Sequence, residues 1–194
     1  PVLTNEDIER LRSVDRDDFR AETVSMLFDV THGDPADNPK KAIDKLVESA
    51  EAAIRNGASL VVLSDRGISQ NMAAIPSLLA AGAVHHGLLA RGLRDEAGLI
   101  IESGEPREVM HYCLLCGFGA NAVNPYLVFE SLGQLQADGA LPADMEPVQI
   151  ADNYIDDENL AQEAQVAALK IASAVAAKNP QLTKSVMDQI IAGT

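Results

Sequence analysis

One pattern occurs four times along the chain: an apolar run, a polar loop, a residue followed by proline, and a helical segment. The apolar runs span 23–30, 59–65, 98–103 and 120–123, and the helix-opening prolines are Pro39, Pro76, Pro106 and Pro125. Proline suits the first turn of a helix, because the amide hydrogens there have no helical partner. Continuous apolar strands joined by helices are typical of a parallel sheet. We therefore expect an α/β fold: a parallel βαβ sheet of about four strands flanked by helices, with a helical C-terminal tail.

The first crossover helix shows the clearest amphipathic spacing. Its predicted buried face consists of Ala42, Ile43, Leu46, Val47, Ala50 and Ile54. Asn38 and Asn124 stand directly before helix-opening prolines and are predicted as helix caps. An additional helix is expected near 4–14, capped by Thr4 or Asn5. The spacing of the units fits either an open doubly wound sheet or part of a (βα) barrel, and four strands are too few to close a barrel.

The chain has 194 residues, 47% of them hydrophobic, which is enough for one sizeable core. We expect residues 1–140 to form one α/β domain. Residues 141–194 differ in character: a proline-bounded loop, a long alanine-rich helix and a short last helix after Pro180. This tail is predicted to pack on the same domain or on a partner, because an apolar helical stripe needs a covering surface.

The net charge of −14 argues against nucleic acid and anionic membranes as partners. The apolar stretches are too short to cross a bilayer, and the N-terminal residues lack the basic start and apolar segment of a signal peptide. Two cysteines in a chain of this length form no disulfide scaffold. A cytoplasmic protein is therefore expected.

Both cysteines lie in MHYCLLCGFGANAVNP, residues 110–125. A redox pair places its first cysteine at a helix N-terminus, whereas Cys113 is predicted well inside a helix among apolar neighbours. We expect structural, buried cysteines, with a thiol redox module as a rival hypothesis. The glycines close a helix and precede a strand, the reverse of a dinucleotide-binding loop, so Gly117 is predicted as a left-handed cap.

Two adjacent histidines, His85 and His86, fall within a predicted helix. Neighbouring helical residues point about 100° apart, which disfavours joint ligation of one ion. We expect one histidine to be half-buried with a hydrogen bond and the other to be exposed. No metal site is predicted, and the common catalytic motifs are absent from the sequence.

Charged and polar residues gather where the predicted strands end. We call this set the strand-end rim; it comprises Asp65, Arg66, Glu102, Glu105, Arg107 and Asn124. Ligands of parallel sheets bind at this edge, so the rim is a candidate site for a dicarboxylate or a phosphorylated ligand. The preferred alternative is that its charges form ion pairs that pin loops or an interdomain contact. No nucleophile or general base is evident, so no catalytic residue is predicted.

The stretch from LVVLSDRGISQNMAAIPSLL through ESGEPREVMHY to GFGANAVNPYLVFESL resembles the central domain of the glutamate synthase large subunit. These motifs occur in the family's order and spacing, and the resemblance is clear to about residue 135. In that family the central domain links a glutamine amidotransferase domain to an FMN-binding synthase barrel that also carries an iron–sulfur cluster. The resemblance implies a connecting role in converting glutamine and 2-oxoglutarate to two glutamates.

What the resemblance implies for this chain is a non-catalytic domain with no cofactor of its own. Its expected partners are the amidotransferase and synthase domains, and oligomerisation stays open. The chain has no nucleophilic cysteine at residue 1 and no cysteine cluster. Whether it is a fragment or a free-standing relative also stays open. The alternative function is a small-molecule-binding module that uses the strand-end rim.

Overall fold

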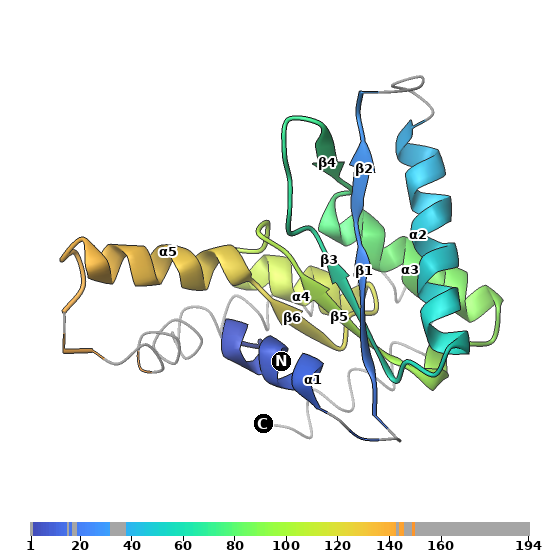
Figure 1. The fold of residues 1–194 in the computed structure, drawn as a ribbon, viewed down its shortest axis with the longest axis horizontal. Coiled ribbons are helices and arrows are strands. Elements are labelled where there is room, and N and C mark those ends of the chain that lie inside the picture. The colour runs from blue at the N-terminus through green and yellow to red at the C-terminus, as the bar shows by residue number, and fades with distance from the viewer. Residues whose placement is uncertain are drawn as a thin grey trace, which may run out of the picture.

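The computed structural model describes residues 2–14, 16, 19–31, 38–142, 144, 145 and 149. The elements follow in the order α1 (Asn5–Ser13), β1 (Ala21–Ser25), β2 (Leu27–Asp29), α2 (Asn38–Arg55), β3 (Leu60–Ser64), β4 (Met72–Ala74), α3 (Ser77–Ala90), a 3₁₀ turn η1 (Arg94–Glu96), β5 (Gly98–Glu102), α4 (Val109–Gly117), β6 (Ala122–Asn124) and α5 (Tyr126–Ala137). The predicted α/β class is confirmed (Figure 1).

The main sheet has four parallel strands in the order β1-β3-β5-β6. Each strand pairs with the next one of the βαβ pattern, as predicted from the repeated sequence units. The outer edge of β6 is met by the N-terminal segment, where the Leu3 amide donates to the Val123 carbonyl at 2.8 Å. Successive strand residues point to opposite faces of the sheet, and on each face they pack in a buried apolar cluster.

Helices α2, α3 and α4 cover the same face of the sheet. Their apolar side chains pack in one cluster with Val61, Leu63, Leu99, Ile101 and Val123 of the strands. The other face carries Val62, Ile100 and Ala122, which pack with Ile8 of α1. Both faces are thus covered, but all three crossover helices lie on one of them. Sequential strand order with crossovers on a single face is the winding of a (βα) barrel segment and not of a doubly wound sheet.

Three local predictions are wrong. The strand expected over 23–30 is divided at Met26 into β1 and β2, and β2 forms a separate antiparallel pair with β4. Segment 72–74 was expected to be loop, since three residues carry no periodicity of their own. Pro106 does not open a helix, because α4 begins only at Val109, after the extended Glu108.

The left-handed glycine at the end of α4 lies two residues later than predicted. Gly117 is the last residue of the helix, and the left-handed conformation falls on Gly119, with φ +107°. The Gly119 amide donates to the Cys116 carbonyl and that of Ala120 to Leu115, which closes the helix. A Cβ at position 119 would lie 2.2 Å from His85 Nδ1, so glycine is required twice over.

The opening helix is capped as predicted by Thr4. Its hydroxyl accepts from the Asp7 amide, while the Asp7 carboxylate accepts from the Thr4 amide, a complete capping box. In the described part of the chain, no helix combines the length and apolar content needed to span a bilayer. The predicted alanine-rich and last helices of the tail lie outside the described residues.

Candidate functional site

A polar row crosses the sheet where its strands end. Ser64, Glu102 and Asn124 are cross-strand neighbours in β3, β5 and β6, and all three are buried. Each stands two residues beyond an apolar residue of the α1-covered face, so alternation places the row on that face. The carboxylate of Glu102 is the charge at the centre of this row.

Glu102 is only 1% exposed, and arginines bind both of its oxygens. Arg12 of α1 reaches Oε2 at 2.7 Å and Oε1 at 3.3 Å, while Arg66 Nε reaches Oε1 at 2.9 Å. A buried carboxylate without such partners would be strongly disfavoured. The arrangement is therefore a three-residue ion cluster that joins α1, the loop after β3 and the end of β5.

The cluster fixes the charge state of Glu102. Burial raises the pKa of the Glu102 carboxyl, but hydrogen bonds from Arg12, Ser64 and Arg66, with the charge of Arg12, outweigh burial and hold it below its ordinary value. Glu102 is thus a permanent anion near neutral pH. Such a group is unsuited to general acid catalysis, which needs a pKa near the working pH.

Arg66 also anchors the start of α5. Its Nη1 pairs with Glu130 at 2.8 Å, and its guanidinium carbon lies 3.9 Å from the centroid of the Tyr126 ring. This cation–π geometry is well within the favourable range. Arg66 thereby links β5 to α5, so the rim arginine serves as an internal connector.

Asp65 is buried and accepts three kinds of hydrogen bond. Ser103 Oγ donates at 2.5 Å, the Gly104 amide lies 3.2 Å from both oxygens, and the Tyr126 hydroxyl also donates to this carboxylate. Burial, then the hydrogen bond to Asp65, raises the pKa of Tyr126 far above its ordinary value. The phenol consequently stays protonated and holds α5 against the loop after β5.

The remaining rim residues, Glu105, Arg107 and Asn124, make separate contacts. Glu105 caps α3: its Oε2 accepts from the Ser77 amide at 2.8 Å and from the Ser77 hydroxyl at 2.6 Å. Arg107 is exposed, and its amide donates to His111 Nδ1. The side chain of Asn124 does not cap α5; it donates to the Leu3 carbonyl and to Asn5 Oδ1, and so holds the N-terminal segment.

The structure therefore places Asp65, Arg66 and Asn124 beside Glu102, whereas Glu105 and Arg107 take part in other contacts. Arg12, Tyr126 and Glu130 were missed by sequence reasoning. Arg12 lies 90 residues from Glu102, and no local spacing could pair them. One signal was available: a glutamate that ends a buried apolar strand requires a cation from elsewhere in the chain.

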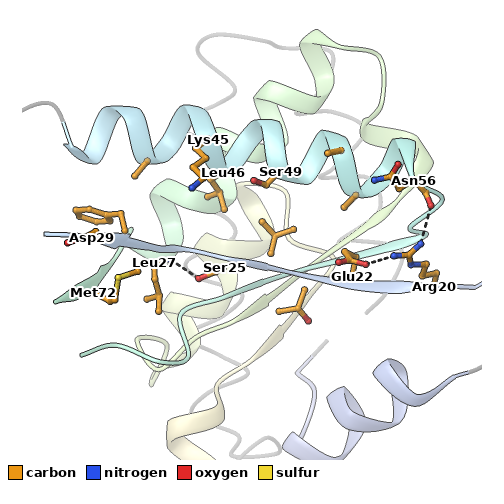
Figure 2. A pocket seen from close by; sticks show the side chains of 16 residues that line it. Arg20, Glu22, Ser25, Leu27, Asp29, Lys45, Leu46, Ser49, Asn56 and Met72 are labelled. Atoms are coloured by element: carbon orange, nitrogen blue, oxygen red, sulfur yellow. Dashed lines mark hydrogen bonds and ion pairs between the residues drawn. The ribbon is translucent and has the colours of Figure 1, made fainter. Parts of the chain in front are cut away.

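A cavity of about 570 Å³ lies beside β1, the outer strand farthest from β6, between β1, β2 and α2 (Figure 2). Arg20 and Glu22 form an ion pair of 2.8 Å at one end, and Lys45 and Ser49 project from α2. None of the rim residues lines this cavity. The rim and the cavity are thus separate features.

The cysteines are less buried than predicted. Cys113 is half-buried and Cys116 is exposed, and the two form no disulfide. Burial, with a smaller effect of Cys116, raises the pKa of Cys113. A raised pKa is the opposite of what an attacking thiolate needs.

The histidine prediction is confirmed. His85 is half-buried and accepts from Arg94 Nε at 3.0 Å through Nδ1, while His86 is exposed. Burial, followed by the nearby charges of Arg94 and His86, lowers the pKa of His85. Over the described residues, no group of three or more metal-ligating side chains comes together.

The glutamate synthase central domain family model matches residues 1–179. The match continues well beyond residue 135, where the resemblance was expected to end. The glutamate synthase [NADPH] large chain of Bacillus subtilis is 36% identical over 73% of this chain, which corresponds to 9% of that protein. The glutamate synthase [NADH] of Schizosaccharomyces pombe is 37% identical over 73% of this chain and 7% of its own length.

The chain thus spans less than a tenth of the curated relatives it matches. A solved mandelate oxidase structure gives a TM-score of 0.46 at 19% identity, over 63% of this chain and 33% of that one, which is too low a likeness to add to the argument. The family match covers the sheet, the ion cluster and α5 together. This chain belongs to the glutamate synthase central domain family.

Proposed function

We propose that this chain is the connecting central domain of a glutamate synthase large subunit and performs no catalysis by itself. In this proposal it joins a glutamine amidotransferase domain to an FMN-binding synthase domain. The complete enzyme would convert glutamine and 2-oxoglutarate to two glutamates. FMN and the iron–sulfur cluster are assigned to other domains, and a cytoplasmic location is part of the same proposal.

The ion cluster at Glu102 is the observation that supports the absence of catalysis in this proposal. In parallel sheets the strand ends are where ligands gather. Here Arg12 and Arg66 bind both oxygens of Glu102. The Asp65 carboxylate already accepts hydrogen bonds from Ser103, Gly104 and Tyr126. A ligand at this edge would have to displace charge-assisted hydrogen bonds of a buried carboxylate, which is costly.

The outer surface of α3 and α4 supports the connecting part. Leu79 and Met110 are half-exposed on these helices, and Phe118 at the end of α4 is exposed as well, although it lies against Gly82 of α3. Three large exposed apolar side chains on two neighbouring helices favour a surface that another protein domain covers, whereas a single exposed apolar residue in a loop is ordinary. The relatives are more than ten times as long as the matched segment, so they supply further chain for such contacts.

The connecting role can be tested in the large chain that carries this domain. We expect Leu79→Asp and Met110→Asp to lower glutamine-dependent glutamate formation, because each places a charge in a covered contact. Ile68→Asp is the matched control, since Ile68 is a 60% exposed apolar residue in the β3–β4 loop. Melting of the isolated domain variants shows whether the fold is intact. Full activity in both α3–α4 variants would overturn the proposal.

A further inference from the structure

Strand β1 forms an edge of the main sheet. Among the described residues it pairs with β3 on one side, and no strand pairs with its other side. The edge of β6, at the far end of the sheet, is instead met by the N-terminal segment through the bond from the Leu3 amide to the Val123 carbonyl. An edge strand presents a row of unpaired backbone amides and carbonyls. Within the described chain, β1 is thus the edge that can accept a further strand.

The backbone direction identifies which residues of β1 would bind that strand. The Met26 amide donates to the Ser64 carbonyl at the end of β3 at 2.8 Å, so the Met26 amide faces β3. Successive residues of a strand direct their backbone groups to opposite sides. Ala21, Thr23 and Ser25 lie an odd number of residues before Met26, and their amides and carbonyls therefore point to the outer side.

Strand β1 lacks the features that keep edge strands from pairing. Natural edges are commonly blocked by Lys, by Pro or by a bulge. The β1 sequence AETVS contains neither residue, and its register with β3 is regular from Ala21 to Ser25. Its one charged side chain, Glu22, is already paired with Arg20 at 2.8 Å. Nothing in β1 itself therefore opposes the addition of a strand.

The cavity of about 570 Å³ lies along this same edge, and α2 forms its other wall (Figure 2). It extends from Arg20 and Asn56 at one end to Asp29 and Met72 at the other. The α2 side chains that line it include three alanines and a serine, which leave room beside β1. Five residues of strand span about 17 Å. A space elongated along a strand suits an extended chain better than a compact small molecule.

The walls of the cavity also specify the side chains of its occupant. Val24 and Leu46 line it as buried apolar residues between β1 and α2. Thr23 and Ser25 also line it, but they are exposed and belong to the other face of β1. Alternate side chains of an added strand would point to these two faces. The fitting segment is therefore extended, with small apolar side chains at every second position and polar ones between them.

A second copy of this chain fits the cavity less well than a single extended segment. Pairing of β1 with its own copy about a two-fold axis would bring two α2 helices over one cavity. The matched segment makes up less than a tenth of the Bacillus subtilis and Schizosaccharomyces pombe relatives. Chains of that length contain many other segments that could supply one strand.

We propose that the groove between β1 and α2 binds an extended segment from another domain of the large subunit, which becomes a fifth strand of the main sheet. Main-chain hydrogen bonds to Ala21, Thr23 and Ser25 hold the segment, and α2 covers its apolar side chains. The source of the segment rests on the proposed function. The site itself is new and differs from the α3–α4 surface.

Hydrogen exchange at single-residue resolution tests the added strand in this chain and in the large chain that carries it. In this chain we expect fast exchange at Thr23 and Ser25 but slow exchange at Met26, whose amide is bound to β3. In the large chain, exchange at Thr23 and Ser25 should slow by about a hundredfold, with Met26 unchanged. Fast exchange at Thr23 and Ser25 in both chains would overturn the proposal.

A pair of variants at Thr23 separates strand addition from other effects. Thr23→Pro removes an outward amide and leaves the pairing with β3 intact, because proline is tolerated where the amide of an edge strand faces outward. Thr23→Ala is the matched control, since both variants lose the hydroxyl that accepts from Arg12 Nε at 3.2 Å. In the large chain, Ser25 should exchange fast in Thr23→Pro and slowly in Thr23→Ala. Equal exchange in the two variants would contradict the added strand, and Met26 reports whether the sheet stays folded.

Two further outcomes would assign the edge to another occupant. Slow exchange at Thr23 and Ser25 in this chain, together with a dimer in light scattering, would show that a second copy pairs with β1. Slow exchange in a monomer would show that the chain covers its own edge. Either result overturns the proposal.

The exchange experiment is independent of the activity test of the connecting role. Reduced activity in Leu79→Asp and Met110→Asp, with fast exchange at Thr23 in the large chain, would overturn the added strand alone. Full activity in both variants, with slow exchange at Thr23 in the large chain only, would support the added strand and overturn the proposed contact at α3–α4.

Discussion

Arg12 and Glu102 are 90 residues apart in the sequence, and their side chains meet at 2.7 Å. Arg12 comes from α1, the only helix of the described chain whose apolar residues pack in the cluster on its face of the sheet. The contact places a protein cation at the strand ends, where a barrel-type domain would otherwise bind a ligand. The domain thus uses its most probable binding edge to hold its own elements together.

Removing the central carboxylate should destabilise the fold more than removing a peripheral one. Glu102→Ala leaves Arg12 and Arg66 without their buried partner, and we expect a loss of about 3 kcal/mol in the free energy of unfolding. Glu130→Ala breaks an exposed pair with Arg66 and should cost about 0–1 kcal/mol. Urea unfolding measures both losses, and equal losses would contradict a stabilising role of the Glu102 ion cluster.

The cap of α3 by Glu105 gives a second stability prediction. Glu105→Ala removes the acceptor for the Ser77 amide and hydroxyl, and we expect a cost of about 1 kcal/mol. Glu105→Gln retains a side-chain oxygen and should cost less than half as much. If the two variants melt at the same temperature, Glu105 does not act as a cap.

Acid stability should depend on Glu102. Because the pKa of this carboxyl is held below its ordinary value of 4.5, the folded state binds fewer protons than the unfolded state in this range. The contribution is therefore complete above about pH 4.5 and is lost as pH falls through the lower, folded-state pKa. Urea unfolding between pH 6 and 3 should show a shallower decline for Glu102→Gln than for the parent chain.

His85 should affect the pH dependence of stability at a higher pH than Glu102 does. Its pKa lies below 6.5 in the folded chain because of burial and the neighbouring Arg94 charge. Protonation is easier after unfolding, so stability present above about pH 6.5 is lost as pH falls toward the folded-state pKa. We expect His85→Gln to flatten the unfolding free energy between pH 7 and 5. An unchanged pH profile would show that His85 is not the responsible group.

The two thiols should differ in reactivity. Cys113 is half-buried with a raised pKa, whereas Cys116 is exposed. We expect iodoacetamide to modify Cys116 several-fold faster, because both access and thiolate fraction disfavour Cys113. Peptide mass spectrometry follows each site separately. Faster modification of Cys113 would revive the redox hypothesis.

Much of the fold was predictable because its signals are local. Proline at helix starts, apolar strand runs and the Thr4 capping box each depend on a few consecutive residues, and the parallel sheet followed from them. The β2–β4 pair was not predictable, since each strand has three residues and forms only by long-range pairing. The start of α4 was misplaced because Glu108 and His111 override the proline signal.

The candidate site was predictable only in part. Strand-end position correctly brought Asp65, Arg66, Glu102 and Asn124 to one edge, because parallel strands share their carboxyl ends. The Arg12–Glu102 pair and the anchoring of α5 by Arg66 are tertiary contacts with no sequence spacing to reveal them. The side chain of Asn124 was expected at a helix cap but instead holds the Leu3 carbonyl, since β6 lies beside the N-terminal segment.

Thermal melting tests most directly whether the strand-end rim is a structural ion cluster or a binding site. The chain is melted with 2-oxoglutarate, glutamate, glutamine, FMN and inorganic phosphate. A ligand at about 100 times its dissociation constant would add about 2.7 kcal/mol of stability, which is readily seen as a higher melting temperature. If the rim is a structural ion cluster, we expect one cooperative transition at the same temperature with every compound. A rise that disappears in both Arg66→Ala and Arg12→Ala would contradict it and show that the rim binds that ligand.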